Sequence, residues 1–201
     1  MMTKFTIEQN KKLIELFPYL LPRNLWNDTV SEDYRYDYIR GTYELPVGWY
    51  RLFLLYCLHI KPYLVKENLL NKFRFSQIKE KCGHICLYDF GSTREIHDVT
   101  SMFTRLSSYV CEWCGQPAKY ETKGWIACLC KKCVGEDKKN SYRIHRKMTL
   151  RVEHFDYSKN KDGEKYVRKL SLKNLWKEYI RCLKLTDEQF YDYIVERGTK
   201  I

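Results

Sequence analysis

The chain has 201 residues and a net charge of +11, and 44% of its residues are hydrophobic. That size fits one compact domain with an appendage or two small domains, and the apolar fraction is ample for a packed core. No run approaches the roughly 18–20 apolar residues of a membrane-spanning helix, and the first residues lack the apolar stretch of a signal peptide. We therefore expect an intracellular protein without a membrane partner.

The first half of the chain is expected to form helices around one β-hairpin. Residues 6–20 open with the capping-box pattern Thr-Ile-Glu-Gln and place their apolar side chains on one face, which predicts a helix. Apolar residues at three- and four-residue steps over 49–60 predict a second helix that begins near Val47. Alternation over 73–90 predicts a hairpin, and a second capping box at Ser92 opens a helix that leads to the first cysteine pair.

The second half continues with strands and then helices. Residues 147–155 alternate like a strand, Asn160-Lys161-Asp162-Gly163 supplies a turn, and 165–172 offers a return strand. Ser171 is a candidate cap for the next helix, and a third capping box at Thr186 opens the last one. We expect an α+β fold in which helices pack on small antiparallel β-hairpins, with a four-cysteine zinc knuckle. The expected units are an α+β domain over 1–108, the knuckle over 109–135, and a basic β-hairpin with C-terminal helices over 136–201.

Four cysteines have the spacing of a tetrathiolate metal site. They form two C-x-x-C pairs, Cys111 with Cys114 and Cys130 with Cys133, separated by fifteen residues. Each pair can turn both sulfurs toward one ion, and the intervening segment can fold back as a small hairpin. Four sulfurs leave no open position on Zn²⁺, so the expected cofactor is structural zinc. The alternatives are a group of unliganded core thiols or a disulfide.

Two further cysteine patterns compete with this assignment. Cys128 precedes Cys130 by two residues and is an alternative ligand, although C-x-C gives a poorer bite than C-x-x-C. Cys82, His84 and Cys86 resemble half of a second metal site, but no second ligand pair lies nearby in the sequence. We favour Cys130 and a single site.

The positive charge is concentrated in the second half of the chain. Residues 111–201 hold 21 basic residues against 13 acidic ones, and the densest stretch runs from Lys131 to Arg151. Such a patch attracts nucleic acid or an acidic protein surface, although a solvated lysine-rich surface is an equally ordinary explanation. The candidate nucleic-acid or partner-binding residues are Lys131, Lys132, Lys138, Lys139, Arg143, Arg146, Lys147 and Arg151.

The sequence favours a binding protein over an enzyme. Zinc-stabilised HNH nucleases carry similar cysteine pairs, but they need histidine and aspartate between the pairs, and residues 115–127 contain neither. The five histidines are scattered, and no phosphate-binding glycine loop or activated serine motif occurs. Trp125, together with Tyr120 and Tyr142, flanks the basic stretch and could stack on bases. We instead expect Trp113 and Trp125 to cover the zinc sulfurs, because a small knuckle has few other apolar groups.

An ordered series of motifs resembles a known group of proteins. The motifs are Phe-Pro-Tyr-Leu-Leu-Pro at 17–22, Leu-Pro-Val-Gly-Trp at 45–49, Phe-Arg-Phe-Ser-Gln-Ile-Lys-Glu-Lys at 73–81, and Cys-Glu-Trp-Cys-Gly-Gln-Pro-Ala at 111–118 with Gly-Trp-Ile at 124–126. Over about residues 10–135 the chain is similar to an uncharacterised zinc-knuckle family of phages, prophages and mobile elements of Firmicutes. It departs from that pattern at Cys82, Cys86 and Cys128, which argues against these three as ligands. Residues from 136 onward are not covered.

The resemblance implies a setting rather than an activity. In that setting we expect a small accessory protein in the cytoplasm of a bacterial host, where it binds and inhibits or modulates a host defence or nucleic-acid-processing complex such as a CRISPR nuclease. The partner is then a host protein or nucleoprotein complex. The first alternative is a regulatory protein that binds DNA or RNA directly, and the second is an immunity protein for a toxin.

Overall fold

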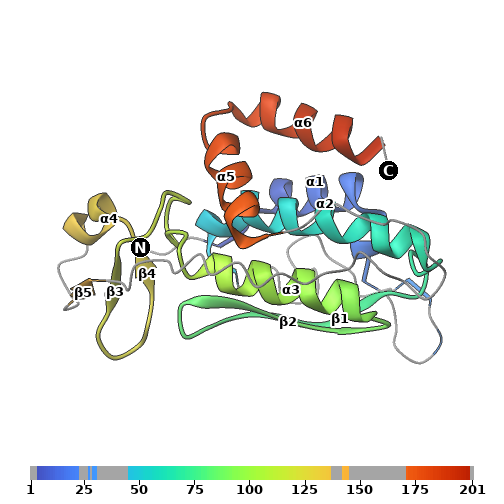
Figure 1. Ribbon diagram of the computed structural model, residues 1–201, viewed down its shortest axis with the longest axis horizontal. Helices are drawn as coiled ribbons and strands as arrows, with labels where there is room; N and C mark the ends of the chain where they lie inside the picture. Colours follow the sequence, from blue (N-terminus) through green and yellow to red (C-terminus); the bar gives the residue numbers. More distant parts are fainter. Residues whose placement is uncertain are drawn as a thin grey trace.

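The structure, a computed structural model, describes residues 4–22, 27, 29–30, 45–136, 142–144 and 171–199. These residues form a body of helices with one β-hairpin, and a smaller lobe at one end of the body (Figure 1). The body contains α1 (Ile7–Leu16), η1 (Pro18–Leu20), η3 (Val47–Trp49), α2 (Tyr50–Lys66), β1 (Arg74–Lys81), β2 (His84–Phe90), α3 (Arg94–Ser107), α5 (Leu172–Cys182) and α6 (Asp187–Thr199). The lobe, residues 111–136 and 142–144, contains β3 (Tyr120–Thr122), β4 (Cys128–Leu129), α4 (Lys131–Glu136) and β5 (Tyr142–Ile144).

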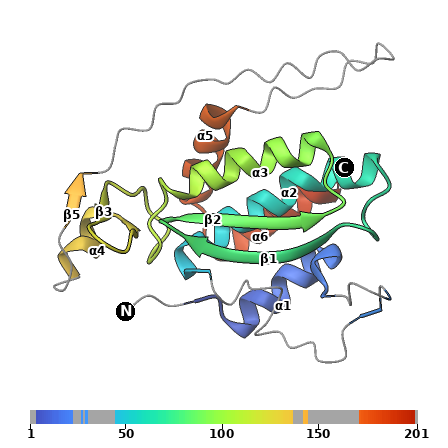
Figure 2. The ribbon, with the colours of Figure 1, turned by 90° about the horizontal axis from the view of Figure 1, so that it is seen from below.

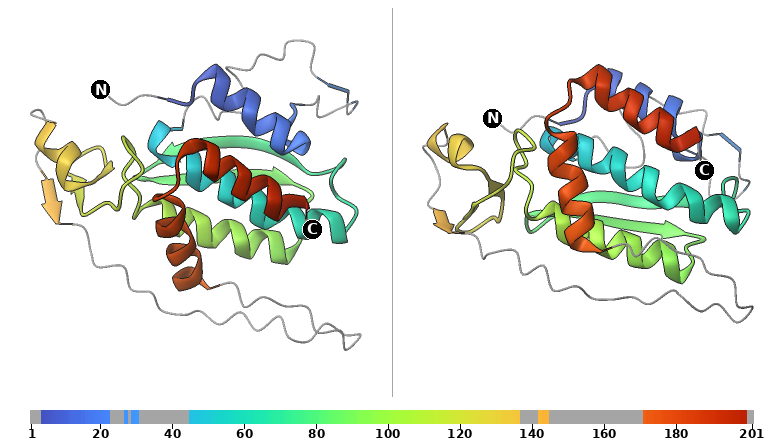
Figure 3. Two further views of the ribbon diagram at one scale, coloured as in Figure 1. Left: turned by 90° about the horizontal axis from the view of Figure 1, so that it is seen from above. Right: turned by 45° about the horizontal axis from the view of Figure 1, so that its top comes forward.

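Helix α2 is the centre of the body. Residues 52–58 are all buried, so this helix is apolar around its whole circumference, as expected of a helix covered on every side. Figure 2 shows the hairpin over one side of α2, with α1 and α3 to either side. Figure 3 shows α6 over the opposite side and α5 crossing next to it. The helix continues through Pro62 to Lys66.

The hairpin predicted for residues 73–90 is confirmed. Strands β1 and β2 pair antiparallel through a two-residue turn, Cys82–Gly83. Both turn residues have positive φ, 51° and 78°, which is the backbone conformation of a type I′ turn. Phe75, Ile78 and Ile85 face the helices and are buried. The turn lies at the end of the body next to the lobe, where a Cβ on Gly83 would meet the side chains of Cys128 and Ile126.

The helix starts follow the capping signals closely. At Thr6 and Thr186 both reciprocal capping-box hydrogen bonds form, and the hydroxyl of Ser171 caps α5. The predicted cap at Ser92 is wrong by one residue. Thr93 lies immediately before the first helical residue, and its hydroxyl accepts the backbone N–H three residues later, so Thr93 caps α3.

The two C-terminal helices share the hydrophobic core of the body. Leu175, Tyr179, Phe190 and Ile194 are buried in the same cluster as the apolar residues of α2 and α3. In packing terms α5 and α6 therefore lie with the expected first unit, residues 1–108. None of the helices in the described ranges is long and apolar enough to cross a membrane.

The lobe is built on a three-stranded antiparallel sheet. Its strand order is β4-β3-β5, with β3 in the centre. The described residues form a mixture of helices and small antiparallel sheets, as the sequence predicts. Strand β5 was not predicted. The strand predicted over 147–155 lies outside the described residues, and Leu172, the predicted end of its partner, belongs to α5.

Candidate metal centre

The four cysteines of the two C-x-x-C pairs come together at one point in the lobe. Their sulfurs all lie within 4.8 Å of one another, and together they could hold a metal ion. The Sγ of Cys114 is 3.6 Å from the Sγ of Cys130 and 3.6 Å from that of Cys133. Cys111, Cys130 and Cys133 are buried, whereas Cys114 is exposed. The prediction that these four residues gather is confirmed.

Local backbone geometry aims each pair at the same point. The N–H of Gly115 donates to the carbonyl of Cys111 (2.9 Å) and closes the first turn, and Gly115 has a φ of 75°, which glycine adopts without strain. In the second pair, Cys130 follows β4 and Cys133 lies in the first turn of α4. The N–H of Cys133 points at the Sγ of Cys130 (3.5 Å), an arrangement that favours a thiolate at Cys130.

The thiol pKa values differ among the members of the cluster. Burial raises the pKa of the Cys111 thiol to about 12, although backbone N–H groups, among them that of Cys130, act against burial. Burial also raises the pKa of Cys133. At Cys130 the N–H of Cys133 and the neighbouring thiols outweigh burial and lower the pKa. Without a cation, Cys111 and Cys133 therefore stay neutral thiols at neutral pH, and a metal ion would have to displace their protons to bind all four sulfurs.

Cys128 does not belong to this cluster. Its side chain is buried on the side of the lobe that faces the body, where a Cβ added to Gly83 in the hairpin turn would lie 2.9 Å from its sulfur. Cys130, and not Cys128, gathers with the other three cysteines, in line with the preference from the sequence. Cys82, His84 and Cys86 belong to no group of three or more metal-ligating side chains among the described residues.

The lobe is attached to the body through backbone groups next to the first cysteine pair. The N–H of Gly48 donates to the carbonyl of Glu112 (2.9 Å), and the indole of Trp49 donates to the carbonyl of Val110 (3.0 Å). The hydroxyl of Tyr179, on α5, donates to the carbonyl of Gly115 (2.6 Å). Two elements far apart in the sequence, η3 and α5, therefore fix the position of the four-cysteine cluster.

Glu112 is buried and links the first cysteine pair to β4. Its carboxylate accepts the backbone N–H of Cys128 (2.7 Å), and its own N–H donates to the carbonyl of the same residue (3.0 Å). Burial raises the pKa of Glu112 to about 8. The sequence reasoning did not identify Glu112, Gly48 or Tyr179. The available signals were an acidic residue inside a C-x-x-C pair and a glycine next to a tryptophan. Neither pattern indicates which residue the side chain or backbone contacts in the folded chain.

The two tryptophans of the lobe behave differently. Trp113 packs against the buried cluster formed by Cys111, Leu129, Cys130 and Cys133, where a covering role was expected. Trp125 is 80% exposed and covers nothing in that cluster. The expectation that Trp125 shields the sulfurs is wrong, because the β3–β4 turn carries its ring away from them.

The predicted basic residues are only partly within the described ranges. Lys131 and Lys132 are exposed on α4. Arg143 lies on β5 and forms an ion pair with Glu121 on β3. Five members of the predicted set lie outside the described residues: Lys138, Lys139, Arg146, Lys147 and Arg151.

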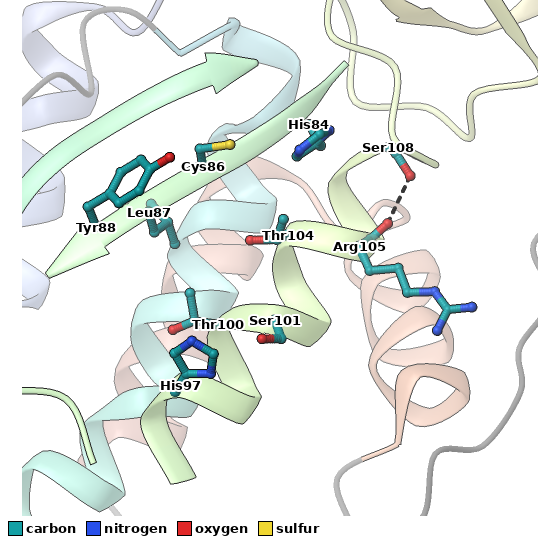
Figure 4. Close-up of a pocket in the computed structure, with 10 residues that line it drawn as sticks. All are labelled: His84, Cys86, Leu87, Tyr88, His97, Thr100, Ser101, Thr104, Arg105 and Ser108. Atoms are coloured by element: carbon teal, nitrogen blue, oxygen red, sulfur yellow. Dashed lines mark hydrogen bonds between the residues drawn. The ribbon is translucent and has the colours of Figure 1, made fainter. Parts of the chain in front are cut away.

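A hollow of about 440 Å³ lies between β2 and α3, away from the metal centre (Figure 4). His84 and Cys86 line it from the strand, and His97 and Thr104 from the helix. The two histidines point into opposite ends of this hollow in Figure 4. Among the described residues, no group of three metal-ligating side chains forms there.

Comparisons with protein-family models, with curated proteins and with solved structures found no match. The family resemblance of residues 10–135 stays a prediction. The geometry of the chain itself therefore carries the functional argument.

Proposed function

We propose that the chain is a non-enzymatic, zinc-stabilised accessory protein that binds a host defence or nucleic-acid-processing complex through the cationic surface of its lobe. The observation that carries this proposal is the four-sulfur cluster, because it makes the lobe a rigid platform rather than a reaction centre. Zinc held by four sulfurs has no open position for water or substrate, and its role is to fix the fold.

The spacing of the sulfurs supports zinc as the ion. With Zn–S bonds of about 2.3 Å, two sulfurs of a regular tetrahedron lie about 3.8 Å apart. The distances from Cys114 to Cys130 and Cys133, both 3.6 Å, are close to this value and far longer than the roughly 2.05 Å of a disulfide. Cys111, Cys114, Cys130 and Cys133 would hold the ion, and Zn²⁺ would supply the positive charge that their thiolates need.

The charge of the lobe supports a polyanionic partner. Residues 111–135 contain four lysines and two glutamates. Both glutamates are engaged inside the lobe, Glu112 with the N–H of Cys128 and Glu121 with Arg143. No ion pair joins any of these four lysines to another residue in the described ranges. Their charge is therefore available to phosphates or to an acidic protein surface.

The mobile-element setting and the choice of a host complex as partner are supported by the motif resemblance of residues 10–135. A protein that acts in this way needs a stable surface of defined charge and no catalytic group. The alternative, a protein that binds nucleic acid directly, differs in making its own contacts with phosphates and bases. One feature of the lobe favours that kind of contact and is argued below.

The test is affinity purification from a bacterial lysate with the tagged full-length chain. A variant with Lys119, Lys123, Lys131 and Lys132 replaced by alanine should lose enrichment of a nuclease or nucleic-acid-processing complex identified by mass spectrometry. The matched control replaces four exposed lysines of the body, Lys72, Lys173, Lys177 and Lys184, and so removes the same charge elsewhere. Equal enrichment by all three proteins, or no such complex with the wild type, would overturn the proposal.

A further inference from the structure

Trp125 is exposed to solvent on a turn whose backbone is held by hydrogen bonds. Trp49, Trp113 and Trp176, the other tryptophans that the structure describes, are buried or half-buried. Tryptophan is usually highly buried, because its large apolar surface gains most from leaving water. An indole that is 80% exposed contributes little to the fold and is free to contact a partner.

The turn beneath Trp125 is held by a buried threonine. The hydroxyl of Thr122, a buried residue at the end of β3, donates to the carbonyl of Trp125 and accepts the N–H of Ala127 (2.7 Å). The N–H of Thr122 also donates to the carbonyl of Ala127 (3.0 Å). Gly124, with a φ of 92°, allows the reversal of the chain. These hydrogen bonds fix the backbone of the turn, while the ring of Trp125 makes little contact with the rest of the protein. Binding through this ring would therefore cost little conformational entropy of the backbone.

The surroundings of the ring are cationic rather than apolar. Lys123 and Gly124, which precede Trp125 in the turn, are exposed, whereas the exposed Lys119 lies just before β3, at the other end of the strand. The other strongly exposed apolar residue of the lobe, Ile144, pairs with Tyr120 at the opposite end of β3 from the turn. Trp125 is therefore a single exposed ring in the same turn as an exposed lysine, Lys123, and is not part of an apolar patch. A docked protein surface would require such a patch, because interface cores combine several apolar side chains.

We propose that the β3–β4 turn binds single-stranded nucleic acid, with the indole of Trp125 stacked on a base and the ammonium group of Lys123 on a phosphate. This inference rests on the proposed function and names the part of the partner that the lobe contacts. Single strands present the faces of their bases, which a duplex hides within its stack, and an exposed ring beside cations is the usual platform for them. Stacking accepts any base, so we expect affinity without strong sequence preference.

The experiment measures the anisotropy of labelled oligonucleotides, a 20-mer of deoxythymidine and a 20-mer of uridine, with the zinc-loaded full-length protein at low salt. Trp125→Ala should weaken binding about 5- to 100-fold, and Trp125→Phe should restore most of the affinity because a ring remains. Lys123→Ala should reduce the slope of log affinity against log salt concentration by about 0.7, as expected for one phosphate contact with a single strand. Ile144→Ala is the matched control, because it removes an equally exposed apolar side chain from the same lobe.

The outcomes separate this inference from the proposed function. Loss with Trp125→Ala and rescue with Trp125→Phe on the single strand, but no effect of either change on a duplex, would establish the stacking contact. Binding that ignores Trp125 would overturn the inference and leave a purely cationic interaction. Purification of the host complex without any affinity for either oligonucleotide would also overturn it, and would show that the partner surface is protein. Failure of both experiments would remove the proposed function as well.

Discussion

The body and the lobe of this protein are held together in different ways. The body has a large apolar core in which aromatic rings meet edge to face, as Phe5 does with Tyr50 and Phe73 with Phe75. The buried cluster of the lobe contains one aliphatic residue, Leu129, and three cysteines. Burial of apolar surface can stabilise the body without help, but the lobe buries little, so we expect it to depend on a metal ion held by the four cysteines.

The seam between the two regions has a character of its own. Several of its contacts involve backbone atoms, as where the backbone of Gly48 meets that of Cys111 and Glu112. Backbone atoms cannot move aside as side chains can, so the lobe has a fixed orientation on the body. The lobe has little apolar core of its own but is held against the body. This arrangement would keep the β3–β4 turn, with its exposed Lys123, in one orientation for a partner.

Removal of the metal should have the largest effect, and it should be confined to the lobe at first. Structural zinc in small domains contributes roughly 10–16 kcal/mol, more than the lobe's apolar contacts can replace. Cys114→Ser should abolish stoichiometric zinc in elemental analysis and remove protection of the amide hydrogens of residues 111–136 from exchange, while α2 keeps its protection. Cys128→Ser, which changes a sulfur outside the cluster, should retain the metal. Equal loss of zinc in both variants would show that the wrong sulfurs were assigned.

The seam is the next most sensitive point, and Gly48→Ala tests it. A Cβ at this position would overlap the carbonyl oxygen of Cys111 and lie 2.6 Å from that of Glu112, and both are backbone atoms. We expect a loss of about 3–4 kcal/mol in the free energy of unfolding, measured by chemical denaturation, because the lobe must move away from α2.

Gly135→Ala is the control for this change. Gly135 lies in α4, and a Cβ there would meet nothing within 4 Å, so its replacement should leave stability unchanged or slightly higher. If both alanine variants were equally stable, the seam would be looser than the structure indicates, and the lobe would be independent of the body.

The comparison of the two regions also explains which features could be predicted. Local signals were sufficient for the capping boxes at Thr6 and Thr186, the 73–90 hairpin and the gathering of the four cysteines, because each depends on residues close in sequence or on a strong ligand spacing. The exposure of Trp125 was not predictable in this way. It depends on the hydrogen bonds of Thr122 beneath the turn, which no composition rule contains. The contacts of Gly48 and Tyr179 with the lobe join residues more than sixty positions apart, so only the folded chain reveals them.

Within the body, one polar network joins α2, α5 and α6, and Glu178 is its centre. His59 and Arg197 contact this carboxylate at 2.9 and 2.7 Å, and Tyr193 donates to it. Burial opposes ionisation, but the hydrogen bond and charge of His59, with the help of Tyr193 and Arg197, lower the pKa of Glu178 to about 2. A carboxyl with a lowered pKa in the folded state adds stability above its unfolded value of about 4.5, and this stability is lost as the pH falls toward 2.

Glu178→Gln should therefore cost about 2–3 kcal/mol at neutral pH and flatten the acid limb of the stability curve between about pH 4.5 and 2. Denaturant titrations at several pH values, with zinc content recorded at each, separate this effect from loss of the metal. Glu15→Gln is the control, because Glu15 pairs with Lys12 on an exposed face where an ion pair contributes little. An unchanged acid limb would mean that the three helices are joined by apolar packing alone.

The smallest effect on stability should come from Tyr179→Phe, which removes one hydrogen bond across the seam. Without the hydroxyl, the carbonyl of Gly115 loses its 2.6 Å donor, and the expected cost is about 1–2 kcal/mol. Tyr88→Phe, at an exposed position on β2, is the matched control and should cost nothing measurable. Faster exchange of amide hydrogens in residues 111–118 of the Tyr179 variant, with unchanged exchange in α2 and with zinc retained, would show that α5 holds the lobe against the body. Exchange that is equally fast in both variants would instead assign that role to Gly48 and Trp49 alone.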